Sequence, residues 1–157
     1  MRMVELTKGM SSMVDDEDYD MLMQWSWFVH KCRNTFYAGR MHSSKKRHIK
    51  MHRVIMGIDD PAIVVDHIDR DGLNNQRSNL RLATSSENLL NAPGWGASGF
   101  RGVSFHKKAN KWQVAVSHQG KSHWIGLFES INDAALAYNK KASELFGQFA
   151  FQNVIKA

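Results

Sequence analysis

The chain has 157 residues, of which 43% are apolar, and a formal net charge of +6 with a sequence pI of about 9.6. This length suits one ordinary domain or two small ones, and the basic balance favours a polyanionic partner. The single cysteine, Cys32, excludes an intrachain disulfide and a cysteine-rich zinc site. The sequence shows no signal-peptide core and no membrane span, which predicts a soluble, cytoplasmic protein, in the host cytoplasm if it is phage-encoded.

The first 25 residues predict a strand followed by a helix. An apolar run at residues 3–6 suits a short strand. The acidic run at residues 15–20 precedes an apolar segment at 21–25, as in the first turn of a helix, where anions meet the positive end of the dipole. A calcium loop is the alternative, but its ligand spacing and its glycine are missing.

Residues 25–57 predict a hairpin, a basic stretch and a short helix. The hairpin strands are residues 25–29 and 35–39, around a turn at Arg33 and Asn34. Residues 31–53 hold eight basic side chains and no acidic one, so this stretch is either a solvated face or a phosphate-contacting region, with Arg47 and Arg53 as DNA-binding candidates. Residues 51–57 suit a short helix closed by a glycine, in which His52 serves for packing or contacts the scissile phosphate.

The segment from residue 63 to residue 91 organises the rest of the chain. A β-branched run at 63–65 predicts a buried strand that leads directly into Asp66 and His67. Because adjacent residues of a regular strand face opposite ways, we expect the strand to bend or end at Asp66. A capping box at residues 84–87 then predicts a short helix that ends before Pro93.

The polar residues of this segment suit phosphodiester hydrolysis. Asp66 offers an anionic oxygen and Asn88 an amide oxygen, which together with water and phosphate oxygens suit Mg²⁺ or Mn²⁺. His67 is neutral near pH 7 and can take a proton from water. Three arginines flank the segment, and any one of them could hold a phosphate: Arg70, Arg77 and Arg81.

The order Asp66, His67, Asn79 and Asn88, preceded by the segment at 51–57, resembles the HNH endonucleases of phage homing type, over about the first 92 residues. The resemblance implies a ββα-metal site. By position, Asp66 and Asn88 are metal ligands, His67 is the general base, and Asn79 braces the loop and helps to orient His67.

A small-residue stretch at 93–98 predicts a linker, and a new pattern follows it. Three alternating segments, within residues 101–106, 111–117 and 122–128, predict a three-stranded antiparallel sheet. Ser130 starts an amphipathic helix that Gly147 ends. Residues 98–157 carry eight basic and three acidic side chains, a net charge of +5, against thirteen and twelve, a net charge of +1, in residues 1–97.

Residues 100–103, 111–112, 124–128 and 133–139 resemble the ethylene-response-factor (apetala-type) DNA-binding domain. The resemblance implies that this sheet lies in the major groove, with Arg101 and Trp124 facing DNA, whereas Trp112 is assigned to the core. Serines replace several arginines of the plant domains, so we expect backbone contacts from lysines rather than tight sequence readout. The candidates for such contacts are Lys107, Lys108, Lys111, His118 and Lys121.

The sequence therefore predicts an α+β protein with an HNH domain over 1–92, a linker over 93–98 and a DNA-binding domain over 99–157. The predicted function is metal-dependent hydrolysis of DNA, nicking a double strand at a recognised site. We expect a monomer that binds double-stranded DNA and neither a membrane nor a small-molecule substrate. The main alternative is a DNA-binding regulator, and an enzyme that acts on structured RNA fits less well, because the deep groove of RNA does not admit such a sheet.

Overall fold

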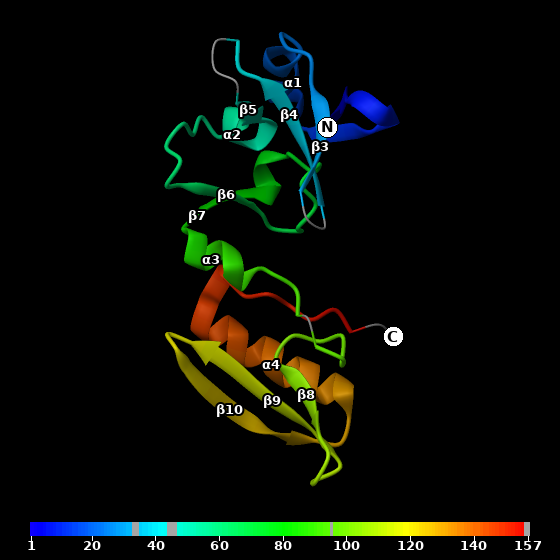
Figure 1. The fold of residues 1–157 in the computed structure, drawn as a ribbon, viewed down its shortest axis with the longest axis vertical. Helices are drawn as coiled ribbons and strands as arrows, with labels where there is room; N and C mark the ends of the chain where they lie inside the picture. The colour runs from blue at the N-terminus through cyan, green and yellow to red at the C-terminus, as the bar shows by residue number, and fades with distance from the viewer. Residues whose placement is uncertain (33–34, 44–46, 95, 156–157) are drawn as a thin grey trace. The chain divides into compact units, whose positions relative to one another are not determined.

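The computed structural model describes residues 1–32, 35–43, 47–94 and 96–155, and the chain forms two compact units, residues 1–85 and 86–157 (Figure 1). The predicted turn at residues 33 and 34 lies outside the described residues. The first unit contains β1 (Arg2–Glu5), η1 (Thr7–Gly9), β2 (Ser11–Val14), α1 (Asp16–Leu22), β3 (Phe28–Cys32), β4 (Thr35–Met41), β5 (His48–Lys50), α2 (Met51–Ile55), β6 (Val64–His67), η2 (Arg77–Asn79) and β7 (Leu80–Ala83).

Three small antiparallel sheets build the first unit. β1 pairs with β2, β4 lies between β3 and β5, and β6 pairs with β7. The predicted helix after the acidic run is α1, which has Asp16, Glu17 and Asp18 in its first turn. The predicted hairpin is confirmed as β3 and β4, although β3 begins at Phe28 rather than at residue 25. The indole of Trp27 instead donates a hydrogen bond of 2.8 Å to the carbonyl of Leu22, which ties this residue to the end of α1.

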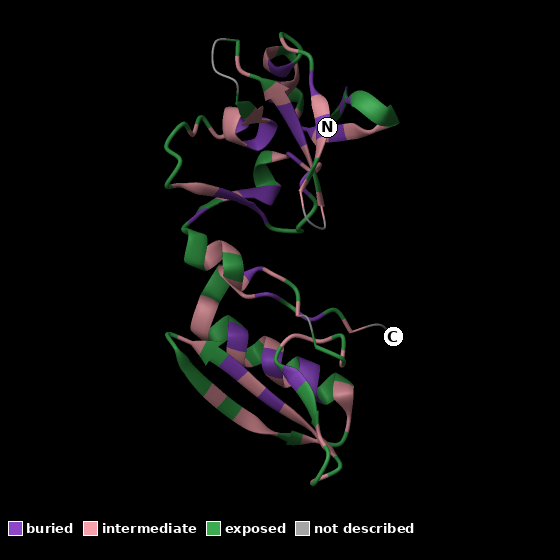
Figure 2. Ribbon diagram, in the orientation of Figure 1, coloured by how far each residue is buried: buried purple, intermediate pink, exposed green. Residues whose placement is uncertain are grey.

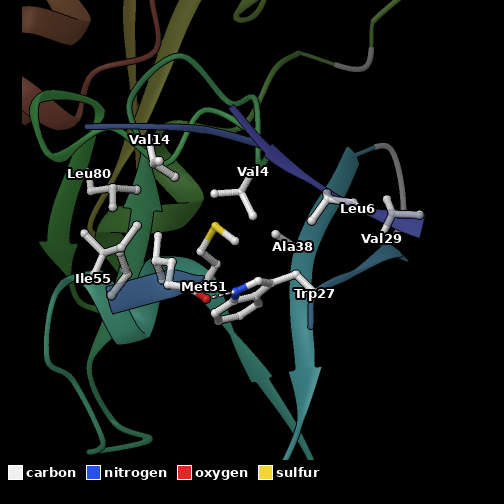
Figure 3. Packing of buried hydrophobic residues seen from close by; sticks show 11 residues of the cluster. Val4, Leu6, Val14, Trp27, Val29, Ala38, Met51, Ile55 and Leu80 are labelled. Atoms are coloured by element: carbon white, nitrogen blue, oxygen red, sulfur yellow. Dashed lines mark hydrogen bonds between the residues drawn. The ribbon is translucent and has the colours of Figure 1, made fainter. Parts of the chain in front are cut away.

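One hydrophobic core joins these sheets to α1 and α2 (Figure 3). Met51, in α2, is fully buried and lies among side chains from the hairpins and from α1. The helix ends as predicted, because Gly57 adopts a positive φ of 65° that glycine tolerates without strain. The buried members of this cluster are Val4, Leu6, Val14, Leu22, Trp27, Val29, Ala38, Met51, Ile55, Val65 and Leu80.

The second unit is a three-stranded antiparallel sheet covered on one face by a long helix. Its strands are β8 (Val103–His106), β9 (Lys111–His118) and β10 (Lys121–Phe128), in the order β10-β9-β8, and its helices are α4 (Ile131–Phe146) and η3 (Gly147–Phe149). The Ser130 side chain caps α4 by accepting hydrogen bonds from the amides of Asn132 and Asp133, and Gly147 follows the last residue with a φ of 54°. The sequence predicted both helix ends.

Burial follows the pattern expected for a sheet with one covered face (Figure 2). Val114 and Val116 in the central strand are buried against Ala134, Tyr138 and Ala142 of α4. Trp112 packs partly buried against this core, as the sequence predicted.

The helix α3 (Ser85–Leu90) falls almost wholly in the second unit, which begins at Ser86. The sequence placed the domain boundary at residue 92, after this helix. The difference has a local cause: the Nη1 atom of Arg101 donates hydrogen bonds to the carbonyls of Leu90, at 2.6 Å, and of Ala92. Arg101 therefore attaches the end of α3 to the start of the second sheet.

Candidate active site

The candidate site is built on the β6–β7 hairpin. Asp66 lies opposite Arg81 and His67 lies opposite Leu80, so the ladder continues to the last residue of β6. The prediction that the strand ends or bends at Asp66 is therefore wrong. The chain leaves the ladder after His67, where Arg70 adopts a positive φ of 69°.

Asp66 and His67 are both buried, with 6% and 5% of their surfaces exposed. Successive residues of a strand project to opposite faces, so the two side chains meet different neighbours. The carboxylate oxygen Oδ2 of Asp66 accepts hydrogen bonds from Nε and Nη2 of Arg81, at 2.8 and 2.6 Å. This predicted metal ligand is thus held by a cation from its partner strand.

His67 lies in a small aromatic cluster. Its ring centroid is 4.9 Å from that of His52, in an edge-to-face arrangement, and 5.7 Å from that of Tyr37. Its Nε2 atom lies 3.0 Å from Oδ1 of Asn75, which is fully buried. The ring is therefore held on one side by aromatic packing and at one nitrogen by an amide.

Burial sets the protonation of this cluster. It lowers the pKa of His67, although the hydrogen bond to Asn75 and the charges of nearby aspartates act in the opposite direction. Burial lowers the pKa of His52 to about 2, and the electrostatic influence of His67, Lys50 and Arg53 acts in the same direction. Both imidazoles are therefore neutral at pH 7, and His67 can accept a proton.

The loop between the two strands is braced by Asn79, as the sequence predicted. Its side-chain oxygen accepts a hydrogen bond from the amide of Asp69, at 3.0 Å. Its nitrogen donates to Oδ1 of Asp69 and to the carbonyl of Asn74, both at 2.8 Å. Burial acts to raise the pKa of Asp69, but hydrogen bonds from Asn74, from the backbone of Asp71 and from Asn79 outweigh it and lower this pKa.

Asn75, rather than Asn79, contacts the ring of His67. The family resemblance assigned the orientation of His67 to Asn79 and gave no role to Asn75. A role for Asn75 could have been suggested from the sequence, because an amide side chain close to a histidine can fix the tautomer of that histidine. No spacing rule, however, showed which of the loop asparagines is buried beside the ring.

Comparison with known proteins matches this same segment to a family. The profile described as HNH endonuclease matches residues 50–90. An uncharacterized HNH endonuclease of Acanthamoeba polyphaga mimivirus is 32% identical over 154 residues, which cover 94% of this chain and 77% of the relative. Protein 3.8 of Escherichia phage T7 is 33% identical over 113 residues, which cover 71% of this chain and 93% of the relative.

The chain belongs to the HNH endonuclease family. It is therefore a nuclease, and the family acts on DNA and generally uses divalent metal ions. No solved structure matches the chain. Among the described residues there is no cluster of three or more His, Cys, Asp or Glu side chains suited to a metal ion, and no helix has the length and apolarity to cross a bilayer.

The arginines of this HNH endonuclease have distinct local partners. Arg77 binds the buried carboxylate of Asp18 through Nε and Nη2, at 2.9 and 2.6 Å, which ties the loop to α1. Arg53, a predicted DNA contact, donates to the carbonyls of Ile63 and Asp60, at 2.8 and 2.7 Å, and so holds the segment before β6. These two side chains are engaged in the fold.

Arg47 and Arg70 are exposed. Lys50 places its Nζ 4.6 Å from the ring centroid of Tyr37, the same ring that contacts His67. A cation thus lies beside the aromatic cluster, at a position that the sequence did not single out.

The other predicted residues belong to the second unit. Asn88 lies half-buried in α3, so its assignment as the second metal ligand stays a prediction. Trp124 is 67% exposed in β10, and its assignment as a DNA-facing residue stays a prediction. The guanidinium of Arg101 instead bonds the end of α3, which differs from the predicted DNA-facing position. Lys107 and Lys121 are exposed, and Lys111 forms an ion pair with Glu129 at 3.3 Å.

Proposed function

We propose that this HNH endonuclease is a metal-dependent enzyme that nicks double-stranded DNA at a recognised site, in the manner of a homing nuclease, with His67 as the general base. The observation that carries the proposal is the placement of His67: a buried, neutral imidazole whose Nε2 meets the amide oxygen of Asn75. Its position within the family segment supports the same role.

The amide contact decides which nitrogen is the base. Because Oδ1 of Asn75 is an acceptor, Nε2 of His67 carries the proton and Nδ1 holds the basic lone pair. Nδ1 takes a proton from water as the water oxygen attacks phosphorus. The bond from phosphorus to the departing sugar oxygen breaks, and solvent supplies that oxygen with a proton.

We propose that a hard divalent cation such as Mg²⁺ or Mn²⁺ takes part in the reaction, because the family generally uses divalent metal ions. Asp66 would supply a carboxylate, and the family resemblance assigns the amide oxygen of Asn88 as a second ligand; Mg²⁺ commonly uses one or two protein ligands and keeps several waters. When bound, the cation stabilises negative charge on the phosphate and on the leaving oxygen. Asp66, which already bonds Arg81, would then have the cation as a second positively charged partner.

DNA contacts are proposed in each unit. In the first, Lys50 beside Tyr37 and the exposed Arg70 and Arg47 supply positive charge for phosphates. In the second, we propose that the uncovered sheet face binds the duplex, with Trp124 exposed on it. The pairs Ser104–Gln113 and Ser117–Ser122 lie opposite one another on neighbouring strands and offer neutral polar groups, which favours modest sequence preference.

The central test is cleavage of supercoiled plasmid and phage genomic DNA with Mg²⁺, with Mn²⁺ and with EDTA. The wild type is expected to convert supercoiled DNA to the nicked form only with metal. His67→Ala and Asp66→Ala are expected to lower the rate by at least about a hundredfold, the usual contribution of a positioned general base. Asp59→Ala removes an exposed carboxylate near the same hairpin and serves as the matched control.

Two outcomes contradict this proposal. Cleavage by His67→Ala at the wild-type rate removes the general-base role. DNA binding by the wild type without cleavage, over all metals and over genomic DNA, favours instead a regulator that binds DNA. Mapping the cut ends on genomic DNA shows whether a single site is recognised.

The proposed role of the second sheet has its own test. Trp124→Ala is expected to weaken DNA binding in EDTA at least tenfold without loss of folding, since an exposed aromatic ring contributes contact area but no core packing. Leu136→Ala, which removes an exposed apolar side chain from α4, is the control. Equal affinities for the two variants count against DNA binding by this face.

A further inference from the structure

A chain of buried hydrogen bonds runs from His67 to the second strand of the protein. Asn75 presents Oδ1 to Nε2 of His67 at 3.0 Å, and its Nδ2 lies 2.7 Å from Oγ of Ser12. Oγ of Ser12 in turn donates to the carbonyl of Leu73 at 2.9 Å. Ser12 and Asn75 are both fully buried, so water does not compete for these bonds.

The carbonyl of Leu73 gives this chain its polarity. A carbonyl oxygen only accepts, so the single hydroxyl proton of Ser12 points to Leu73. The lone pairs of the hydroxyl are then left to accept from the Nδ2 of Asn75. That orientation of the amide turns Oδ1 toward His67, which places the proton of the imidazole on Nε2.

The backbone of the same strand supports the arrangement. The amide of Met13 donates to the carbonyl of Leu73, and the amide of Asn75 donates to the carbonyl of Met13, both at 2.8 Å. β2 therefore pairs with the loop on both sides of Asn74. The distance between Ser12 and Asn75 is fixed by main-chain bonds rather than by side-chain packing alone.

We propose that Ser12 is a positioning residue for DNA hydrolysis, which acts through Asn75 to hold His67 as the Nε2-protonated tautomer. The inference rests on the proposed function of His67. Ser12 lies outside the segment that matches the HNH profile, residues 50–90, so strand β2 adds a residue to the site that the family segment does not contain. Ser12 is fully buried and bonds only through Asn75 toward His67, so the effect that we propose for it is on the orientation of the base.

The decisive variant is Ser12→Ala, which removes both the acceptor for Asn75 and the donor for Leu73. Without that acceptor the amide of Asn75 can flip and present Nδ2 to the imidazole, which favours a proton on Nδ1 instead. Long-range ¹⁵N–¹H spectra of the histidine rings report the tautomer, and the His67→Ala spectrum identifies the signal of His67. The matched control is Ser11→Ala, which changes the neighbouring residue of β2, opposite Glu5 and outside this chain of bonds.

The wild type and Ser11→Ala are expected to show the Nε2-protonated form of His67. Ser12→Ala is expected to show a mixture of tautomers and a single-turnover rate about 10 to 100 times lower, the usual loss when a base is misplaced by a remote change. Its affinity for DNA in EDTA is expected to stay within about twofold of the wild type. A purely structural role would lower stability without changing the tautomer.

A wild-type His67 protonated on Nδ1 overturns the inference without any variant. A folded Ser12→Ala protein that keeps either the wild-type tautomer or the wild-type rate also overturns it. If Ser12→Ala does not fold, Ser12→Cys, which fills nearly the same volume with a poor hydrogen-bonding group, is judged by the same two readouts. If the wild type cleaves no DNA, the proposed function fails by itself, and the tautomer readout alone decides the role of Ser12.

Discussion

Arg81 and Asp66 face one another across the β6–β7 ladder, and two guanidinium nitrogens of Arg81 bond one carboxylate oxygen of Asp66. Both side chains are largely buried, with 11% and 7% of their surfaces exposed. Arg81 thus supplies an opposite charge to a carboxylate that lies in the protein interior. In the proposed enzyme, the same carboxylate is also a ligand for a divalent cation.

Removing Arg81 is expected to make the stability of the protein depend on metal. Arg81→Gln leaves the buried charge of Asp66 without its partner, so the free energy of unfolding in EDTA should fall by about 3 kcal/mol. Mg²⁺ or Mn²⁺ should restore much of this loss, because a cation that binds only the folded state stabilises it by mass action. Thermal unfolding with and without metal measures both effects.

The matched control is Arg77→Gln, which removes the guanidinium partner of another buried carboxylate, that of Asp18. It should destabilise the protein to a comparable extent, with no gain on adding metal. Equal responses of the two variants to metal would contradict the assignment of Asp66 as a ligand.

Stability is expected to fall as the pH drops below about 6.5, because of His52. The folded protein keeps this imidazole neutral down to a pKa of about 2, whereas the unfolded chain takes up a proton near pH 6.5. The contribution is present above pH 6.5 and is lost as the pH falls, with a slope that approaches about 1.4 kcal/mol per pH unit, or about 2 kcal/mol between pH 6.5 and pH 4.5. His67, whose pKa is also lowered, adds in the same direction.

Urea unfolding at pH 7.5, 6.5, 5.5 and 4.5 tests this dependence. His52→Phe places an aromatic ring that does not titrate beside His67 and should flatten the pH dependence by about half or more. If the free energy of unfolding of this variant changes with pH as steeply as that of the wild type, His52 is not the group responsible.

Asn79→Ala is expected to destabilise the loop of the β6–β7 hairpin. The variant leaves the amide of Asp69 and the carbonyl of Asn74 without their side-chain partner, a loss of about 2–3 kcal/mol. Urea unfolding measures it. Asn132→Ala, at an exposed position of α4, should change the free energy of unfolding by less than about 0.5 kcal/mol.

Arg101→Ala is expected to loosen α3. A six-residue helix is too short to be stable alone, and Arg101 bonds the carbonyls at its end. Loss of a bond to a charged group, worth about 1.5–3 kcal/mol, should raise amide exchange in residues 86–92 at least about tenfold. Lys107→Ala, an exposed cation of the same unit, should leave exchange there unchanged, and a similar rise in both variants would assign the effect to charge alone.

The sequence predicted the helices and the second sheet well, because their signals are local. The acidic first turn of α1, the Ser130 cap and Gly147 all act within a few residues of the helix ends that they mark. β2 was missed, since its four residues show no alternation long enough to separate a strand from a turn. Its pairing with β1 and with Asn75 is a tertiary property.

The sequence singled out Asp66 and His67 but not the side chains that hold them in place. Asp66 and His67 were found by their spacing within a family pattern. The partners that hold them come from other parts of the chain: Arg81 from the opposite strand, His52 from α2 and Ser12 from β2. A pattern along one segment carries no information about which distant side chain fills the space beside it.

The bonds from β2 to the loop join residues about 60 positions apart, with sequence separations of 61 for Ser12 and Leu73 and 63 for Ser12 and Asn75. Contacts between such distant residues form late, because closing the large loop between them costs conformational entropy before the contacts can stabilise the fold. The β6–β7 hairpin, by contrast, joins residues close in sequence and can form early. Refolding of this protein should therefore pass through a state that has the hairpin but no hydrolytic activity, and recovery of cleavage should lag behind recovery of secondary structure.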